Sequence, residues 1–230
     1  MAVPAIQKST LKFLQDLSVN NNRDWFNDNR ARFELAKANV EQMMDALIAK
    51  MNVHDQIDTP NGTKSLYRIY NDVRFSKDKS PYNPRFFAYM KRVKPMLRGG
   101  YYLWIKPGGK SRVACGFLAP NADDLKRIRE DISLNYDTWK KLLKSKNLVE
   151  NFGAMQGDQV KTAPRGFSVD DPAIELIRYK QFWFEASFTD REVLSPDFVN
   201  TLNKTFKSIR PFFNYVSDVL TSDANGESLF

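Results

Sequence analysis

The residues of this chain whose types and spacing could do chemistry lie in one stretch, Arg68 to Tyr82, which reads RIYNDVRFSKDKSPY. Its fifteen residues include two arginines, two lysines, two aspartates and two tyrosines. Guanidinium groups hold phosphate or carboxylate through paired hydrogen bonds, and an ammonium group adds a point charge. The stretch is therefore a candidate anion-binding site in which Arg68 and Arg74 form the fork. Lys77 and Lys79 would add positive charge to it.

The same stretch allows other interpretations, and its spacing forces none of them. Asp72 could orient an arginine or act as a general base, and Asp72 with Asp78 could hold a magnesium ion. Lys79 and Tyr82 could form an acid–base pair if the lysine lowers the pKa of the phenol. A further interpretation needs no ligand: a buried network of arginine and aspartate side chains that pins an irregular segment to a sheet.

The net charge of the chain is concentrated around this stretch. Residues 64 to 98 contain ten Lys or Arg and two Asp, so this segment accounts for the whole formal net charge of +8. Clustered like charge repels itself unless an anionic partner offsets it, or unless acidic helices elsewhere neutralise it as a solvated surface. Aromatic residues interleave with the basic ones, which is typical of surfaces that bind single-stranded nucleic acid. They are Tyr67, Tyr70, Phe75, Tyr82, Phe86, Phe87 and Tyr89.

Several classes of site are excluded by composition. One histidine, His54, and one cysteine, Cys115, cannot supply a zinc site built on several such ligands. The paired glycines at 99–100 and 108–109 lack the helix and the Lys-Ser/Thr of a phosphate-binding loop, so we predict no dinucleotide cofactor. No segment has the apolar length of a membrane span, and the first ten residues contain no secretion signal. A single thiol that alternates with apolar residues is expected in the core and favours the cytoplasm.

The elements that must position the stretch follow from hydrophobic periodicity and from turn residues. We expect helices over residues 11–17, 23–51, 122–134 and 136–148, a short helix that begins at Asp171-Pro172, and a last helix that begins at 195–197. Pro211 is expected to bend or break that last helix near residues 206–207. Strands are expected over residues 66–70, 85–93, 101–106, 111–118 and 181–188, with a further short one at 159–161.

This order of elements predicts an α+β fold, because helices and strands are grouped along the chain and do not alternate as in βαβ units. We expect a single domain over residues 1–230, with a largely antiparallel or mixed sheet flanked by long amphipathic helices near both ends. Residues 221–230 are polar and are expected to form a frayed tail.

Five stretches of the chain resemble the domain-of-unknown-function 2461 family. They are NNRDWF at 21–26, the stretch at 68–82, GGYY at 99–102, PRGF at 164–167 and VLSPDF at 193–198. The family motif is similar to Arg-x-x-Arg-Asp-x-Arg-Phe followed by Asp-Lys and Tyr, and Asn71 stands here in place of its second arginine. The resemblance covers nearly the whole chain. Because the family name records no established activity, the resemblance implies a fold and a motif but no reaction.

Three hypotheses for function remain at this stage. The first is that segment 64–98 binds a phosphate- or carboxylate-bearing ligand, either a nucleotide or a nucleic acid. The second is an enzyme for a small anionic substrate, which expects Arg68, Asp72, Arg74, Lys79 and Tyr82 to converge on one pocket. The third is the structural network without a ligand. The sequence carries no signal for an oligomeric state.

Overall fold

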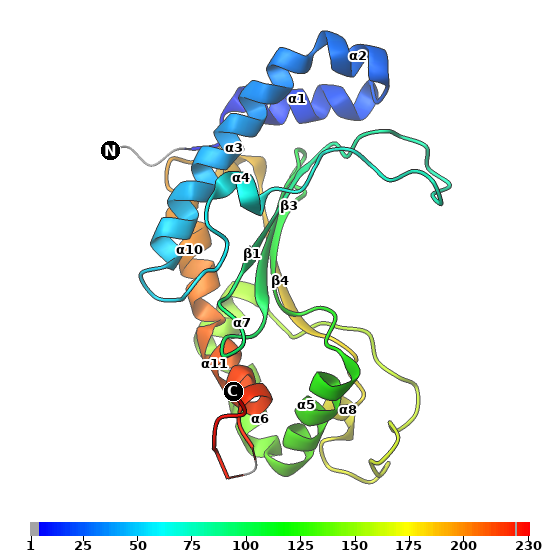
Figure 1. Ribbon diagram of the computed structural model, residues 1–230, viewed down its shortest axis with the longest axis vertical. Helices are drawn as coiled ribbons and strands as arrows, with labels where there is room; N and C mark the ends of the chain where they lie inside the picture. The colour runs from blue at the N-terminus through cyan, green and yellow to red at the C-terminus, as the bar shows by residue number, and fades with distance from the viewer. Residues whose placement is uncertain (1–4, 224) are drawn as a thin grey trace. The chain divides into compact units, whose positions relative to one another are not determined.

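The strands of the protein form one antiparallel sheet with the order β1-β2-β3-β4, so each strand pairs with its neighbours along the chain. The computed structural model describes residues 5–223 and 225–230 (Figure 1). The strands are β1 (Phe86–Lys91), β2 (Gly100–Ile105), β3 (Ser111–Phe117) and β4 (Phe182–Phe188). The predicted α+β class is therefore confirmed, and so is the hairpin formed by β2 and β3.

Helices make up 46% of the chain. The helices in the described residues are α1 (Lys8–Val19), α2 (Arg23–Asp28), α3 (Arg30–Met51), α4 (Gly62–Ser65), α5 (Ala122–Leu134), α6 (Tyr136–Leu143), α7 (Lys146–Phe152), α8 (Ile174–Ile177), α9 (Asp190–Val193), α10 (Phe198–Ser208) and α11 (Arg210–Thr221). None of the helices that the structure describes is long and apolar enough to cross a membrane.

Three of the predicted long helices are each divided in two. The helix expected over 23–51 breaks at Asn29, whose amide donates to the carbonyl of Trp25 and so closes α2 before α3 begins. The helix expected over 136–148 breaks at residues 144–145. The last helix breaks at Ile209 and not at 206–207, because Pro211 lies in the first turn of α11, where its missing N–H is not needed.

Three short elements also differ from the predictions. Residues 66–70 form two isolated bridges, Leu66 to Ala88 and Tyr70 to Tyr82, and residues 159–161 form one, Gln159 to Tyr179, so the expected strands are absent there. Helix α8 begins at Ile174, later than expected, because the Asp171 carboxylate accepts the N–H of Ala173 and forms a turn first. In the tail, Ser222 and Ser228 form a bridge.

Two compact units make up the chain. Unit 1 comprises Met1–Met90, Tyr102–Val113 and Ser187–Lys204, and unit 2 comprises Lys91–Tyr101, Ala114–Ala186 and Thr205–Phe230. A single domain over residues 1–230 therefore stays a prediction.

The core of unit 1 joins the N-terminal helices to β1. Phe26 of α2 and Phe33 of α3 lie with their ring centroids 5.1 Å apart, and Phe33 stacks on Phe86 of β1 at 6.3 Å. Burial of such rings is the main source of stability for this helical layer. It holds α3 against the sheet edge from which the candidate site is built.

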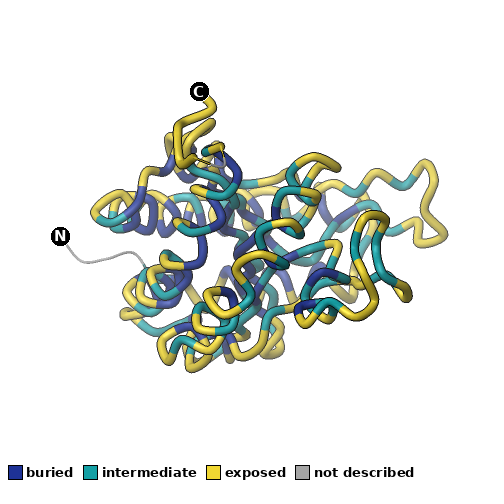
Figure 2. Tube along the Cα trace, turned by 90° about the horizontal axis from the view of Figure 1, so that it is seen from below, coloured by how far each residue is buried: buried dark blue, intermediate teal, exposed yellow. Residues whose placement is uncertain are grey.

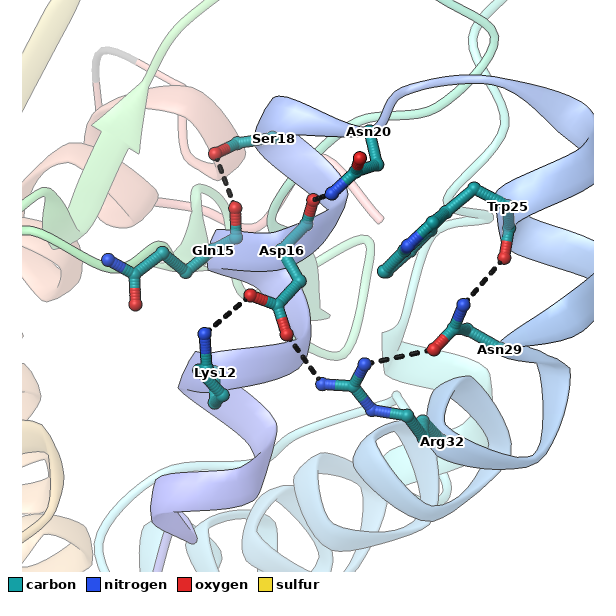
Figure 3. A network of polar contacts seen from close by, with 8 residues as sticks. All are labelled: Lys12, Gln15, Asp16, Ser18, Asn20, Trp25, Asn29 and Arg32. Carbon is teal, nitrogen blue, oxygen red and sulfur yellow. Dashed lines mark hydrogen bonds and ion pairs between the residues drawn. The ribbon is translucent and has the colours of Figure 1, made fainter.

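A polar network ties α1 to α3 on the outer side of this layer (Figure 3). The Asp16 carboxylate accepts hydrogen bonds from Lys12 Nζ at 2.6 Å and from Arg32 Nη2 at 2.7 Å. Arg32 also donates to Asn29 Oδ1 at 2.9 Å, so the network includes the residue that divides α2 from α3. These two cations lower the pKa of Asp16 below its usual value of 3.8.

This network predicts a pH dependence of stability. Because the pKa of Asp16 is lower in the folded state, its contribution is present above about pH 4 and is lost as the pH falls through the folded-state pKa. We expect the free energy of unfolding of the wild type to exceed that of Asp16→Asn by less than about 1 kcal/mol at neutral pH. Urea denaturation of both proteins should show the difference vanishing in acid. A difference that persists in acid contradicts this assignment.

The core of unit 2 packs the last helix against β2. Tyr101 lies with its ring centroid 5.0 Å from that of Phe206 and 5.1 Å from that of Phe213, both in edge-to-face contacts. Asp131 accepts hydrogen bonds from Trp139 Nε1 at 2.7 Å and from the Tyr215 hydroxyl at 2.8 Å. The Cys115 thiol is fully buried, and burial raises its pKa. Since the thiolate is the nucleophile, Cys115 is a core residue, as predicted.

Candidate functional site

The stretch singled out by the sequence forms a long arm that projects from unit 1 (Figure 1). Residues 69–71 and 81–83 pair at its base, where Tyr70 and Tyr82 form an antiparallel bridge. The Asn71 N–H donates to the Pro81 carbonyl at 2.9 Å, and the Asn83 N–H donates to the Ile69 carbonyl at 2.7 Å. Residues 72–80, the arm tip, are mostly exposed (Figure 2).

The arm base is held by amide side chains and a ring. Asn21 binds both backbone groups of Tyr82: its Nδ2 donates to the carbonyl at 2.8 Å, and its Oδ1 accepts the N–H at 3.1 Å. The ring of Tyr82 stacks on Phe26 at 4.0 Å and is buried. The Asn71 side chain donates to the Ser80 carbonyl at 2.8 Å. These contacts fix the arm base, and they involve none of the charged residues.

The charged residues of the arm tip contact each other or the local backbone. Arg74 donates to both carboxylate oxygens of Asp72, at 2.9 and 2.7 Å, and both side chains are exposed. Asp78 accepts the N–H of Ser80, and Lys79 Nζ donates to the carbonyl of Val73. These contacts are local and solvent-exposed. The expected buried arginine–aspartate network that pins the segment to the sheet is therefore not the arrangement observed.

The exposure of this pair predicts a small effect of mutation. Because Asp72 and Arg74 are two residues apart on an exposed loop, we expect Asp72→Ala to leave the melting temperature unchanged within experimental error. Differential scanning calorimetry of the variant and the wild type tests this. A large drop in the melting temperature would support the network as a structural pin.

The pocket in unit 1 lies next to the arm base and has a volume of about 460 Å³. One wall is α3, and the other is formed by residues 66–70 with Thr63 and Phe86. Two features bring the walls together. The Gly62 Cα lies against the backbone of α3, since a Cβ there would meet the Glu41 carbonyl oxygen at 2.0 Å, and the Tyr67 N–H donates to the carbonyl of Phe87 on β1.

Three cationic side chains line this pocket, but two of them are already paired. Arg30 Nε donates to Glu34 Oε1 at 2.8 Å, and Lys37 Nζ lies 2.9 Å from an oxygen of Glu41. Arg30 also donates to the Tyr70 hydroxyl at 3.3 Å. The Arg68 guanidinium, by contrast, makes no hydrogen bond or ion pair with the residues that the structure describes.

The family model described as "Conserved hypothetical protein (DUF2461)" matches residues 9–215 of the 230-residue chain. The chain belongs to this family. No curated protein and no solved structure matches the chain.

The structure distributes the family motif over three environments. Arg68 lines the pocket, Asn71 and Tyr82 belong to the arm base, and the charged residues from Asp72 to Lys79 lie on the arm tip. Of the five side chains that the enzyme hypothesis expects in one pocket, Arg68 alone is in its lining. Burial also raises the pKa of Tyr82, which opposes a role as an acid–base phenol.

The motif residues form no cluster of metal ligands in the described part of the chain, and they supply only part of the pocket lining. Among the residues that the structure describes, no group of three or more His, Cys, Asp or Glu could hold a metal ion, and Asp72 and Asp78 bind different local partners. Sequence reasoning missed Arg30 and Lys37. Their spacing of seven residues on one long helix places both on the same face, which was a usable signal.

Proposed function

We propose that the protein binds a small phosphate- or carboxylate-bearing molecule, such as a nucleotide, in the pocket between α3 and residues 66–70. The observation that supports this most is the Arg68 guanidinium, which lines the pocket and makes no hydrogen bond or ion pair in the described part of the chain, although its charge acts on the nearby Asp72. Guanidinium groups form paired hydrogen bonds with phosphate and carboxylate, so an anion would replace water on the donors of this exposed side chain.

The rest of the pocket suits such a ligand. Arg30 and Lys37 add charge, and although each is paired with a glutamate, together with Arg68 they keep the lining cationic. The rings of Phe33, Tyr67 and Tyr70 supply an aromatic surface beside these charges. The volume of about 460 Å³ falls within the usual size of small-molecule pockets. In a nucleotide, the phosphate would contact the cationic side chains and the planar base would contact the aromatic rings.

The proposal narrows the broader expectation for the basic segment 64–98. The arm-tip residues Arg74, Lys77 and Lys79 are outside the pocket lining, so they would act on a ligand through long-range attraction only. We also propose a cytoplasmic location, because the single cysteine is buried and unpaired and forms no disulfide.

Isothermal titration calorimetry at low ionic strength tests the proposal with four compounds: inorganic pyrophosphate, citrate, ADP and adenosine. We expect one or more of the three anions to bind, ADP to bind more tightly than adenosine, and added salt to weaken the binding. Failure of all three anions to bind, or equal affinity for ADP and adenosine, contradicts the proposal.

A further inference from the structure

A second surface of unit 1 has the character of a binding site, and it lies on the sheet itself. Phe86 of β1 packs on Phe33 of α3, so alternate residues of β1 point to the opposite face. That outward face carries Phe87 and Tyr89 on β1 and Tyr102 and Trp104 on β2, which are all half-buried. Together with the exposed Tyr67, which lies beside β1, we call these five residues the aromatic face.

The rings of the aromatic face form a cross-strand stack. The Arg112 guanidinium lies 4.8 Å from the centroid of Trp104, Trp104 lies 4.9 Å from Phe87, and Phe87 lies 4.8 Å from Tyr67. The row therefore begins at an arginine on β3 and ends at the ring of Tyr67, which is 56% exposed. Beside it, the rings of Tyr89 and Tyr102 stack at 4.5 Å. The contact with Phe87 holds the Tyr67 ring in place before any ligand binds.

Arg85 brings a buried donor without an acceptor to this face. It immediately precedes β1, and its charge interacts with that of Arg112, whose guanidinium lies over the Trp104 ring. Its Nε is buried and has no hydrogen-bond partner among the described residues. Burial lowers the pKa of Arg85, and the nearby Arg112 charge lowers it further. Strands β1, β2 and β3 contain no Asp or Glu, and β4, the neighbour of β3, contains one, Glu185.

A buried guanidinium donor without an acceptor costs free energy, which an anionic ligand would recover. An ordered row of rings offers a surface on which unpaired bases stack, and the adjacent arginine matches a backbone phosphate. We propose that the aromatic face binds single-stranded nucleic acid, with Arg85 on a backbone phosphate and the ring of Tyr67 under a base. This site shares Tyr67 with the lining of the proposed ligand pocket, whereas Arg85, Phe87 and Trp104 are outside that lining.

Fluorescence anisotropy tests the proposal with a labelled oligothymidylate, a labelled oligouridylate and a DNA duplex. We expect the wild type to bind both single strands more tightly than the duplex. Arg85→Gln should weaken the binding about tenfold and reduce the slope of log affinity against log salt by about 0.7, the loss of one phosphate contact. Tyr67→Ala should weaken it about tenfold as well.

Two control variants distinguish binding at the aromatic face from binding elsewhere on the protein. Arg191→Gln, which removes an exposed arginine of α9, should bind the single strands as the wild type does. Arg68→Ala should also keep single-strand binding while binding the small anion more weakly. The proposal is overturned if the wild type binds no single strand, prefers the duplex, or is unaffected by both Arg85→Gln and Tyr67→Ala. If Arg68→Ala loses as much single-strand affinity as the aromatic-face variants do, the nucleic acid binds in the pocket, and the proposal is overturned.

Should Arg85→Gln fail to fold, as judged by circular dichroism, the comparison of Tyr67→Ala with Arg68→Ala decides the matter. Both side chains are exposed and both line the pocket, so a loss in Tyr67→Ala alone assigns the single strand to the aromatic face, and no loss in Tyr67→Ala overturns the proposal. Failure of single-strand binding leaves the pocket proposal intact, since pyrophosphate binding and its dependence on Arg68 are measured without any nucleic acid.

Discussion

Replacing Arg68 with alanine is expected to weaken the binding of inorganic pyrophosphate about 10- to 100-fold, the range for loss of charge-assisted hydrogen bonds. The reason is that Arg68 makes no hydrogen bond or ion pair with the described residues, whereas Arg30 and Lys37 are each paired with a glutamate of α3. The variant removes an exposed side chain, so its melting temperature should match that of the wild type. Calorimetric titration measures the affinity directly.

Two further variants sharpen this prediction. Arg68→Lys keeps the charge but loses the planar fork, so its affinity should fall between those of the wild type and the alanine variant. Arg165→Gln removes an exposed arginine of unit 2 and should leave the affinity unchanged. If Arg68→Ala binds pyrophosphate as tightly as the wild type, the pocket assignment is wrong.

Replacing Tyr82 with alanine is expected to lower the free energy of unfolding by about 3–5 kcal/mol, the usual cost of deleting a large buried ring. Tyr82 is 4% exposed, and its ring stacks on Phe26 at 4.0 Å where the arm base joins the helical layer. The loss should leave a cavity next to Phe26. Urea denaturation of the variant and the wild type gives the difference.

Tyr82→Phe separates this structural role from a chemical one. It keeps the stacked ring and removes only the hydroxyl, so stability should change by less than about 1.5 kcal/mol. Its pyrophosphate affinity should equal that of the wild type. If Tyr82→Phe folds normally but loses pyrophosphate binding, the Tyr82 hydroxyl takes part in the site and this prediction is wrong.

The fold was readable from sequence where local signals agree with each other. The β2–β3 hairpin is marked by alternating apolar residues on both sides of Pro107-Gly108-Gly109. The start of α5 is marked by Asn121, whose side chain accepts the N–H of Asp124 as a helix cap. By contrast, the helix break at Asn29 depends on one side chain turning back to the Trp25 carbonyl, and periodicity alone does not reveal that.

The candidate site was only partly predictable because its walls are distant in sequence. The residue types of the motif correctly suggested that Asp72 could orient an arginine, since the contact with Arg74 is local. That Arg68 lines a pocket opposite α3 depends on the pairing of Leu66 and Tyr67 with β1. Such long-range pairing has no signature within fifteen residues of chain. The role of Asn71 was not predictable for the same reason. Its side chain reaches the Ser80 carbonyl only because residues 69–71 pair with residues 81–83.

Two-dimensional ¹H–¹⁵N NMR during a titration with inorganic pyrophosphate is the most direct test of whether an anion binds beside Arg68. The account predicts saturable shifts concentrated at the amides of residues 30–37 and 66–70, which form the two walls of the pocket. In Arg68→Ala these shifts should require about 10- to 100-fold more pyrophosphate. Shifts confined to the arm tip at residues 72–80, or no saturable shift in the wild type, would contradict the account.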